Sequence, residues 1–151
     1  MGGDQGLFET QDDGQHWQKI AAVQGYVSAL VATGSRAGEP RTIFCATDQG
    51  LYRWQEGQQI RQVSRLPASV PASRLAVSAN GSALYALFHS DLWFSSNLGK
   101  TWVRREHFAR ADMVALVLDP TNPGRLLAGF YSPGLVLSSS DGAVTWHVLT
   151  E

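Results

Sequence analysis

The sequence has little that would support a cysteine-based site or a membrane span. Cys45 is its only cysteine, which excludes an intrachain disulfide and a zinc site built from several thiolates. Its neighbours Ile43, Phe44 and Ala46 are apolar, so we expect Cys45 to be a small buried residue and not a nucleophile. No run approaches the 18 apolar residues that a transmembrane helix needs. The first residues lack the pattern of a signal peptide, which leaves two readings open: a cytoplasmic protein, or one whose leader has been removed.

An excess of positive charge is also missing. Twelve Lys and Arg residues stand against thirteen Asp and Glu residues, for a net charge of -1, so a nucleic-acid partner is not expected. The 151 residues are 44% hydrophobic and 17% charged, which is typical of one globular domain that buries roughly 70% of its unfolded surface. No segment has convincing helical periodicity. Fifteen glycines with five tryptophans, four tyrosines and six phenylalanines favour an all-β protein rich in turns.

The sequence repeats itself with a period of about 40 residues. Four similar segments occupy residues 6–8, 50–52, 91–93 and 134–136, and their leucines are spaced by 44, 41 and 43 residues. This period is typical of propeller blades made of four antiparallel strands. We therefore predict an all-β chain of about three and a half β-propeller blades.

A second motif follows three of the four segments. Residues 10–17, 95–102 and 139–146 share the pattern Ser/Thr-x-Asp-x-Gly-x-Thr-Trp, with lapses. An Asp or Asn side chain can accept hydrogen bonds from backbone N–H groups one or two residues on, and glycine supplies a positive φ, so the pattern predicts a hairpin turn. The tryptophan then starts the returning strand and covers the turn. The residues predicted to form these turns are Thr10, Asp12, Gly14, Trp17, Ser95, Asn97, Gly99, Thr101, Trp102, Ser139, Asp141, Thr145 and Trp146.

These segments resemble Asp-box repeats, also called bacterial neuraminidase repeats. Residues 118–129 are similar to the strand–loop–strand that precedes the box in sortilin-like receptors, xyloglucan-cleaving glycoside hydrolases and the photosystem II assembly factor. The resemblance covers essentially the whole chain and implies the architecture rather than an activity. This sequence departs from the pattern at His16, Asn97 and Ala143, which stand where Thr, Asp and Gly are usual. The second repeat has lost the box, and we expect a hairpin there held by Trp54 or Ile60.

The repeats divide the chain into a partial blade over residues 1–21 and blades over about 22–66, 67–108 and 109–151, all in one propeller segment. Closed propellers have four to eight blades, and an open arc leaves apolar blade faces uncovered. Two explanations therefore stay open: the chain closes a ring with copies of itself, or it belongs to a longer propeller that supplies the remaining blades.

Each predicted blade consists of four strands, which we call A to D in chain order. The resemblance implies binding sites on the face formed by the D–A and B–C loops, and places the boxes on the opposite face as structural turns. Polar and aromatic groups converging on one face suit a protein or carbohydrate ligand, although the simpler interpretation is that they are solvated loop residues. The candidate ligand-face residues are Tyr26, Asp48, Arg65, Arg74, His89, Asp91, His107, Arg110 and Tyr131.

The sequence shows no known arrangement of catalytic residues. Sialidase chemistry would need three converging arginines and a tyrosine paired with a carboxylate, which the sequence does not place together. The histidines lack metal-ligand spacing, and no glycine-rich phosphate loop occurs, so we expect no catalytic residue, metal or cofactor. The leading hypothesis is a non-enzymatic binding scaffold. The alternative is a fragment of a secreted sialidase-like or xyloglucanase-like glycoside hydrolase with its catalytic residues mostly outside the chain. The resemblance implies an extracellular or periplasmic location.

Overall fold

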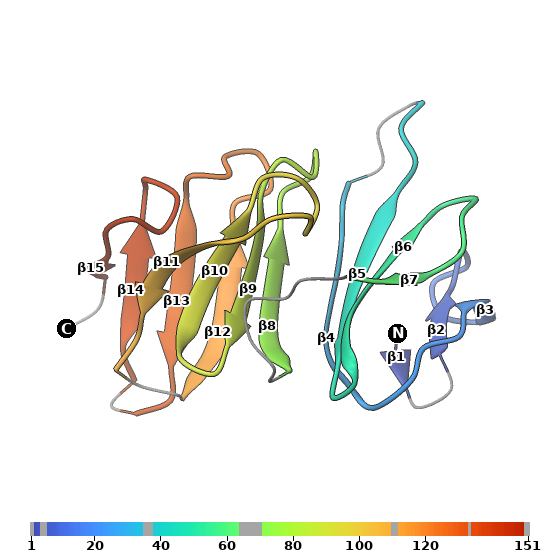
Figure 1. Ribbon diagram of the computed structural model, residues 1–151, viewed down its shortest axis with the longest axis horizontal. Helices are drawn as coiled ribbons and strands as arrows, with labels where there is room; N and C mark the ends of the chain where they lie inside the picture. The colour runs from blue at the N-terminus through green and yellow to red at the C-terminus, as the bar shows by residue number, and fades with distance from the viewer. Residues whose placement is uncertain are drawn as a thin grey trace.

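A computed structural model describes residues 2–3, 6–34, 38–63, 71–109, 112–132 and 134–149. Within these ranges fifteen strands form four antiparallel sheets that follow one another along the chain (Figure 1). The first sheet contains β1 (Gly2–Gly3), β2 (Gly6–Glu9) and β3 (Gln18–Ala21). The second contains β4 (Val27–Ala32), β5 (Thr42–Thr47), β6 (Gly50–Gln55) and β7 (Arg61–Gln62).

The third and fourth sheets have the same plan. The third contains β8 (Ala72–Val77), β9 (Leu84–Phe88), β10 (Asp91–Ser95) and β11 (Val103–His107). The fourth contains β12 (Met113–Leu118), β13 (Leu126–Phe130), β14 (Val136–Ser139) and β15 (His147–Val148). In each of them the strands pair in chain order. The predicted fold class, an all-β chain with three four-stranded units and a partial one, is confirmed. In the described part of the chain, no helix is long and apolar enough to cross a bilayer.

Three apolar cores lie between consecutive sheets. Alternate residues of a strand such as β5 or β9 point to opposite faces of its sheet and so enter different cores. The core between the first and second sheets includes Leu7, Ile43 and Cys45. The core between the second and third includes Phe44, Ala46, Leu84, Ala86 and Phe88. The core between the third and fourth includes Tyr85, Leu87, Leu126, Ala128 and Phe130. Neighbours in one strand, such as Phe44 and Cys45, therefore serve different cores.

The hairpin of the second repeat is anchored as expected for a repeat without a box. Trp54 is buried, and Ile60 packs against the same core between the first two sheets. Gly57 at the tip has a φ of 76°, which closes the turn with a hydrogen bond of 2.9 Å from the Gln58 N–H to the Gln55 carbonyl. Apolar packing thus replaces the side-chain hydrogen bonds of the other turns.

The first strands of the three complete sheets, β4, β8 and β12, are the inner strands, which contact one another from sheet to sheet. They are also linked by polar contacts. The Ser28 hydroxyl donates to the Ala72 carbonyl at 2.8 Å, and the Arg74 Nε–H donates to the Val114 carbonyl at 3.0 Å. Beyond the strand ends, the Gly34 N–H donates to the Ala79 carbonyl at 2.9 Å, and the Ala79 N–H donates to the Pro120 carbonyl at 3.2 Å. These bonds join the second sheet to the third and the third sheet to the fourth.

Candidate functional site

The three box-like turns share one hydrogen-bond pattern that begins at a hydroxyl. The hydroxyl oxygens of Thr10, Ser95 and Ser139 each accept a backbone N–H from the residue four positions on, at 2.9, 2.9 and 3.0 Å. Each hydroxyl also donates to the acid or amide side chain two positions on, at 2.7, 3.0 and 2.9 Å. The hydroxyl therefore satisfies a backbone donor in the middle of the turn that has no strand partner.

The acid or amide side chain closes the second half of the turn. Oδ1 of Asp12, Asn97 and Asp141 accepts the backbone N–H four residues further on, at 2.9 Å in each case. This span is longer than the one or two residues that the sequence suggested. At Asp141 the Thr145 hydroxyl and N–H, and at Asp12 the His16 N–H and ring, favour the ionised carboxylate and hold its pKa below the usual value.

Two adjacent positive φ angles explain the variable glycine of these turns. The pairs are Asp13 (55°) with Gly14 (89°), Leu98 (57°) with Gly99 (84°), and Gly142 (76°) with Ala143 (66°). Glycine relieves the strain at either position of a pair. The departure at Ala143 is therefore compensated by Gly142 directly before it.

The box tryptophans differ in how well they are covered. Trp102 packs against the core shared with the second sheet, and Trp146 packs against the core shared with the third. The rings of Phe88 and Phe108 meet them edge-on, at centroid distances of 6.1 and 5.5 Å respectively. Trp17, in contrast, is 45% exposed, because no sheet precedes its own in the described chain. Trp102 and Trp146 are therefore packing residues that are partly buried, whereas Trp17 is largely uncovered.

The candidate ligand face lies along the lower edge of Figure 1, at which the turns after β5, β9 and β13 are all found. At the second sheet, the Tyr26 N–H donates to Asp48 Oδ1 at 2.8 Å, and the Asp48 N–H donates back to the Tyr26 carbonyl at 3.2 Å. Gly25 lets the carboxylate approach, since a Cβ there would lie 1.9 Å from Asp48 Oδ1. These bonds fix the backbone while the Tyr26 residue stays 75% exposed.

The fourth sheet carries the same two residue types in reversed positions. Asp112 precedes the first strand, and its carbonyl accepts the Tyr131 N–H at 3.2 Å. Asp112 Oδ2 accepts the Ser132 N–H at 3.1 Å. Tyr131 is 80% exposed. Asp112, which the D–A loop contributes to the predicted face, thus fixes the turn that carries Tyr131.

Between them, the third sheet presents charged groups. His107 Nδ1 lies 2.8 Å from Asp91 Oδ1, and an Arg104 nitrogen lies 3.6 Å from the same oxygen. His89 forms the turn with a φ of 56° and is exposed. The face thus combines two exposed aromatic rings with an ionisable cluster on the sheet between them.

Other candidates do not join this group. Arg74 lies on β8, and its guanidinium donates to the backbone carbonyls of Val114 and Ser73 at 3.0 and 2.6 Å. The bond to Val114 links the third sheet to the fourth. Arg65 and Arg110 lie outside the described residues. Within the described ranges, no three His, Cys, Asp or Glu side chains gather in a way that could hold a metal ion.

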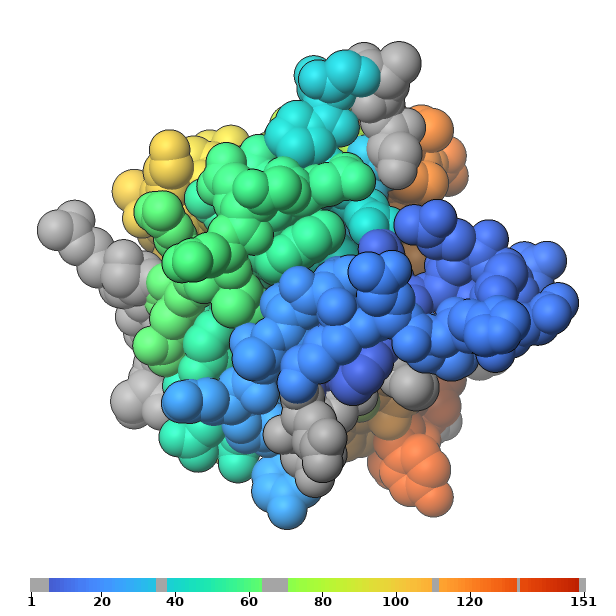
Figure 2. Space-filling model, turned by 90° about the vertical axis from the view of Figure 1, so that its right-hand side faces the viewer, coloured from blue at the N-terminus to red at the C-terminus, as the bar shows by residue number. Residues whose placement is uncertain are grey.

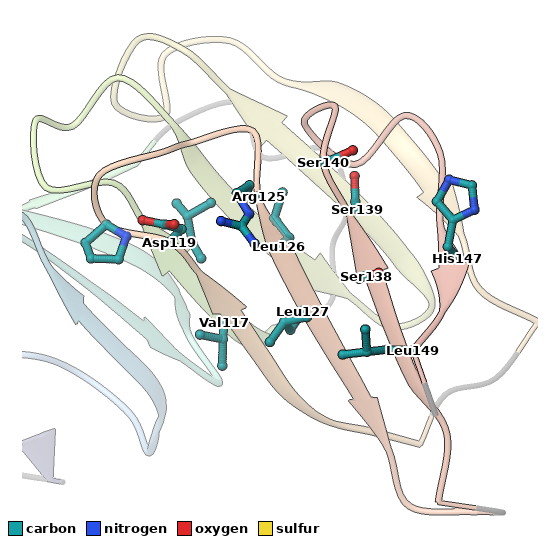
Figure 3. A pocket seen from close by; sticks show the side chains of 12 residues that line it. Val117, Asp119, Arg125, Leu126, Leu127, Ser138, Ser139, Ser140, His147 and Leu149 are labelled. Carbon is teal, nitrogen blue, oxygen red and sulfur yellow. The ribbon is translucent and has the colours of Figure 1, made fainter. Parts of the chain in front are cut away.

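A separate hollow of about 560 Å³ lies on the outer face of the fourth sheet (Figure 3). Val117, Leu127 and Leu149 form a row across the sheet in Figure 3, and these residues are 55%, 41% and 57% exposed. Arg125 and His147 also line the hollow. The sequence predicted an uncovered apolar face at each end of the arc, but the individual residues could be named only once the register was known.

Comparisons with known proteins show the fold. No protein-family model matches the chain, and a search of curated protein sequences finds no significant match. Among solved structures, a GH74 xyloglucanase from Xanthomonas campestris aligns with a TM-score of 0.68 and 21% identity, covering 97% of this chain and 27% of that one. YCF48 bound to D1 peptide aligns with a TM-score of 0.65 and 20% identity, covering 93% and 45%.

YCF48 from Cyanidioschyzon merolae gives a TM-score of 0.68 at 14% identity, covering 93% of this chain and 49% of that chain. The chain therefore spans about half the length of the YCF48 structures and about a quarter of the xyloglucanase. The four sheets are blades of a partial β-propeller. The similar structures include both glycoside hydrolases and proteins without an enzyme name, so they do not decide between catalysis and binding.

Proposed function

We propose that the chain is a segment of an Asp-box β-propeller and acts as a non-enzymatic scaffold that binds a protein or a glycan on its D–A and B–C face. The observation that carries this proposal is the pair of exposed tyrosines, Tyr26 and Tyr131. Both are held by backbone bonds to an aspartate, and both flank the Asp91–His107 pair. Exposed aromatic rings on a rigid backbone bind sugars and peptides with little loss of conformational entropy.

The Asp-box assignment is supported by the three turns. Their hydroxyl and carboxylate or amide groups are engaged within the turns themselves. The lowered pKa of Asp12 and Asp141 is the reverse of what a general acid requires. These groups stabilise the blades, and the ligand is bound elsewhere.

The test is a titration with two defined probes, xyloglucan oligosaccharides and an array of synthetic peptides. We expect at least one of the two to bind, and each of the variants Tyr26→Ser and Tyr131→Ser to weaken that binding by about tenfold or more. Val103→Ser is the control, because Val103 is similarly exposed at 57% but lies on the outer strand β11. Binding that survives both tyrosine substitutions would exclude this face.

A glycoside hydrolase fragment is the second candidate function. It is favoured by the structural similarity to GH74 enzymes, one of which is named a xyloglucanase. The same oligosaccharides serve for this test, because release of reducing ends by the purified chain would show catalysis. Binding without release supports the scaffold.

A further inference from the structure

The outer face of the fourth blade has the same construction as the covered faces inside the arc. The first hairpin of each complete blade closes with an equivalent backbone bond, namely Thr33 N–H to Thr42, Ser78 N–H to Ala83, and Asp119 N–H to Arg125. These bonds align Val117 with Ala76 and Leu127 with Tyr85. Ala76 and Tyr85 are buried against the following blade, whereas Val117 and Leu127 are exposed.

The first sheet carries the other surface of such a junction, namely the one that faces a preceding blade. Gly6 and Gly50 have the same φ of 137°. Gly6 pairs with Gly3 in the same way that Gly50 pairs with Thr47. The three strands β1 to β3 therefore correspond to strands B, C and D of the other blades. Trp17 then corresponds to Trp102 and Trp146, which face the preceding blade. Figure 2 views the molecule from the end at which this sheet lies, with its residues in blue on the surface.

One internal junction shows how the two halves fit. A Cβ on Gly99 would lie 3.2 Å from Val63 Cγ1 of the preceding blade, whereas a Cβ on Gly14 would meet nothing within 4 Å. Val63 occupies the position of Leu149, because the N–H groups of these two residues donate to the carbonyls of Leu51 and Val136 respectively, at 2.7 and 2.8 Å. Leu149 is exposed, and the space beside Gly14 is open.

The last blade also lacks polar groups for a further inner strand. Inside the arc, the side chains of Ser28 and Arg74 donate to the next inner strand. The Ala79 N–H donates to Pro120, two residues after β12. The corresponding residues of the fourth blade are Val114, Ala115 and Pro120, aligned by the same register. Valine and alanine side chains donate no hydrogen bond, and proline has no backbone N–H. This face therefore suits a sheet without an inner strand, and within the described residues the first sheet consists of β1, β2 and β3.

We propose that the outer face of the fourth blade binds the first sheet of a second copy of this chain, head to tail, so that two copies close one ring. Leu149 fills the space beside Gly14 of the other copy, and Trp17 enters the hollow lined by Val117 and Leu127. A head-to-tail contact closes when the rotation returns to its start. Two copies bring four sheets each, and a ring of that size is within the range of closed propellers. The interface is separate from the proposed ligand face.

The first measurement is the mass in solution by light scattering after size exclusion, over a range of concentrations. We expect twice the chain mass of 16.4 kDa. Val117→Lys should shift the mass to that of one chain, whereas Val103→Lys, with nearly equal exposure of 57% against 55%, should leave the pair intact. Circular dichroism of both variants checks that they are folded. A wild-type mass of one chain at every concentration would overturn the proposal and indicate that other blades cover this face.

The second measurement tests the head-to-tail geometry. Leu98 and Val63 line one hollow at an internal junction, and their counterparts at the ends are Asp13 and Leu149. Asp13→Cys and Leu149→Cys proteins, each made separately, should form a disulfide-linked pair when mixed and little of it when oxidised alone. Cys45 is buried and does not compete. A pair that survives Val117→Lys, or a mixture that does not cross-link, contradicts this interface. Neither outcome alters the binding test at Tyr26 and Tyr131.

Discussion

At the scale of single residues, backbone conformations that disfavour side chains determine which substitutions the turns tolerate. Gly25 and Gly57 have nearly the same φ, 86° and 76°. Their surroundings differ, because a Cβ at Gly25 would meet Asp48 Oδ1 at 1.9 Å and a Cβ at Gly57 would meet nothing within 4 Å. The two positions therefore separate the cost of the backbone angle from the cost of the contact.

We predict that Gly57→Ala lowers the free energy of unfolding by about 1 kcal/mol, the cost of the left-handed conformation alone. Gly25→Ala should cost at least about 2 kcal/mol, since it also displaces the carboxylate that accepts the Tyr26 N–H. Urea denaturation of the two variants measures both values. Equal losses would show that the bond between Tyr26 and Asp48 contributes nothing.

Asp141 gives the turns a dependence on pH. Its pKa is lowered from 3.8 by hydrogen bonds, first from the Thr145 hydroxyl. The folded state therefore releases this proton more readily than the unfolded state. The resulting stabilisation is fully present above about pH 4 and is lost as the pH falls below the unfolded value.

Asp141→Asn is the matching substitution, because Asn97 already occupies this position in the third sheet and accepts the equivalent N–H. We expect the variant to be less stable than the wild type at pH 7, and the difference to shrink between pH 4 and pH 2. Urea midpoints across this range measure it. A difference that stays constant with pH would mean that the charge of Asp141 does not stabilise the turn.

At the scale of elements, the blades are held together by the cores between sheets. Trp146 connects the C–D turn of the fourth blade to Phe108 of the third at a centroid distance of 5.5 Å. We predict that Trp146→Ala lowers the free energy of unfolding by about 3 kcal/mol, because it opens a cavity at this junction. Val103→Ala, on an exposed strand position, should change it by less than about 0.5 kcal/mol. Similar decreases in the free energy of unfolding for both variants would show that packing of Trp146 does not stabilise this junction.

At the scale of the whole molecule, Cys45 reports on unfolding. It is fully buried between the first two sheets, and desolvation raises the pKa of its thiol to about 11. At pH 8 about one such thiol in a thousand is ionised. We predict that iodoacetamide alkylates it only as fast as the chain unfolds, with one adduct formed rapidly in concentrated urea. Rapid labelling without denaturant, followed by mass spectrometry, would show that the first junction opens independently.

The sequence alone determined the local structure of this protein. The repeat of about 40 residues predicted an all-β chain of about three and a half blades, since alternating apolar residues and glycine turns depend on neighbours close in the chain. It also placed Thr10, Ser95 and Ser139 in equivalent turns. Only the tertiary structure decided that Arg74 bridges two sheets, that Trp17 stays exposed, and that the Asp112 carboxylate accepts the Ser132 N–H. These outcomes depend on which sheet lies beside which, and such contacts join residues far apart in the sequence.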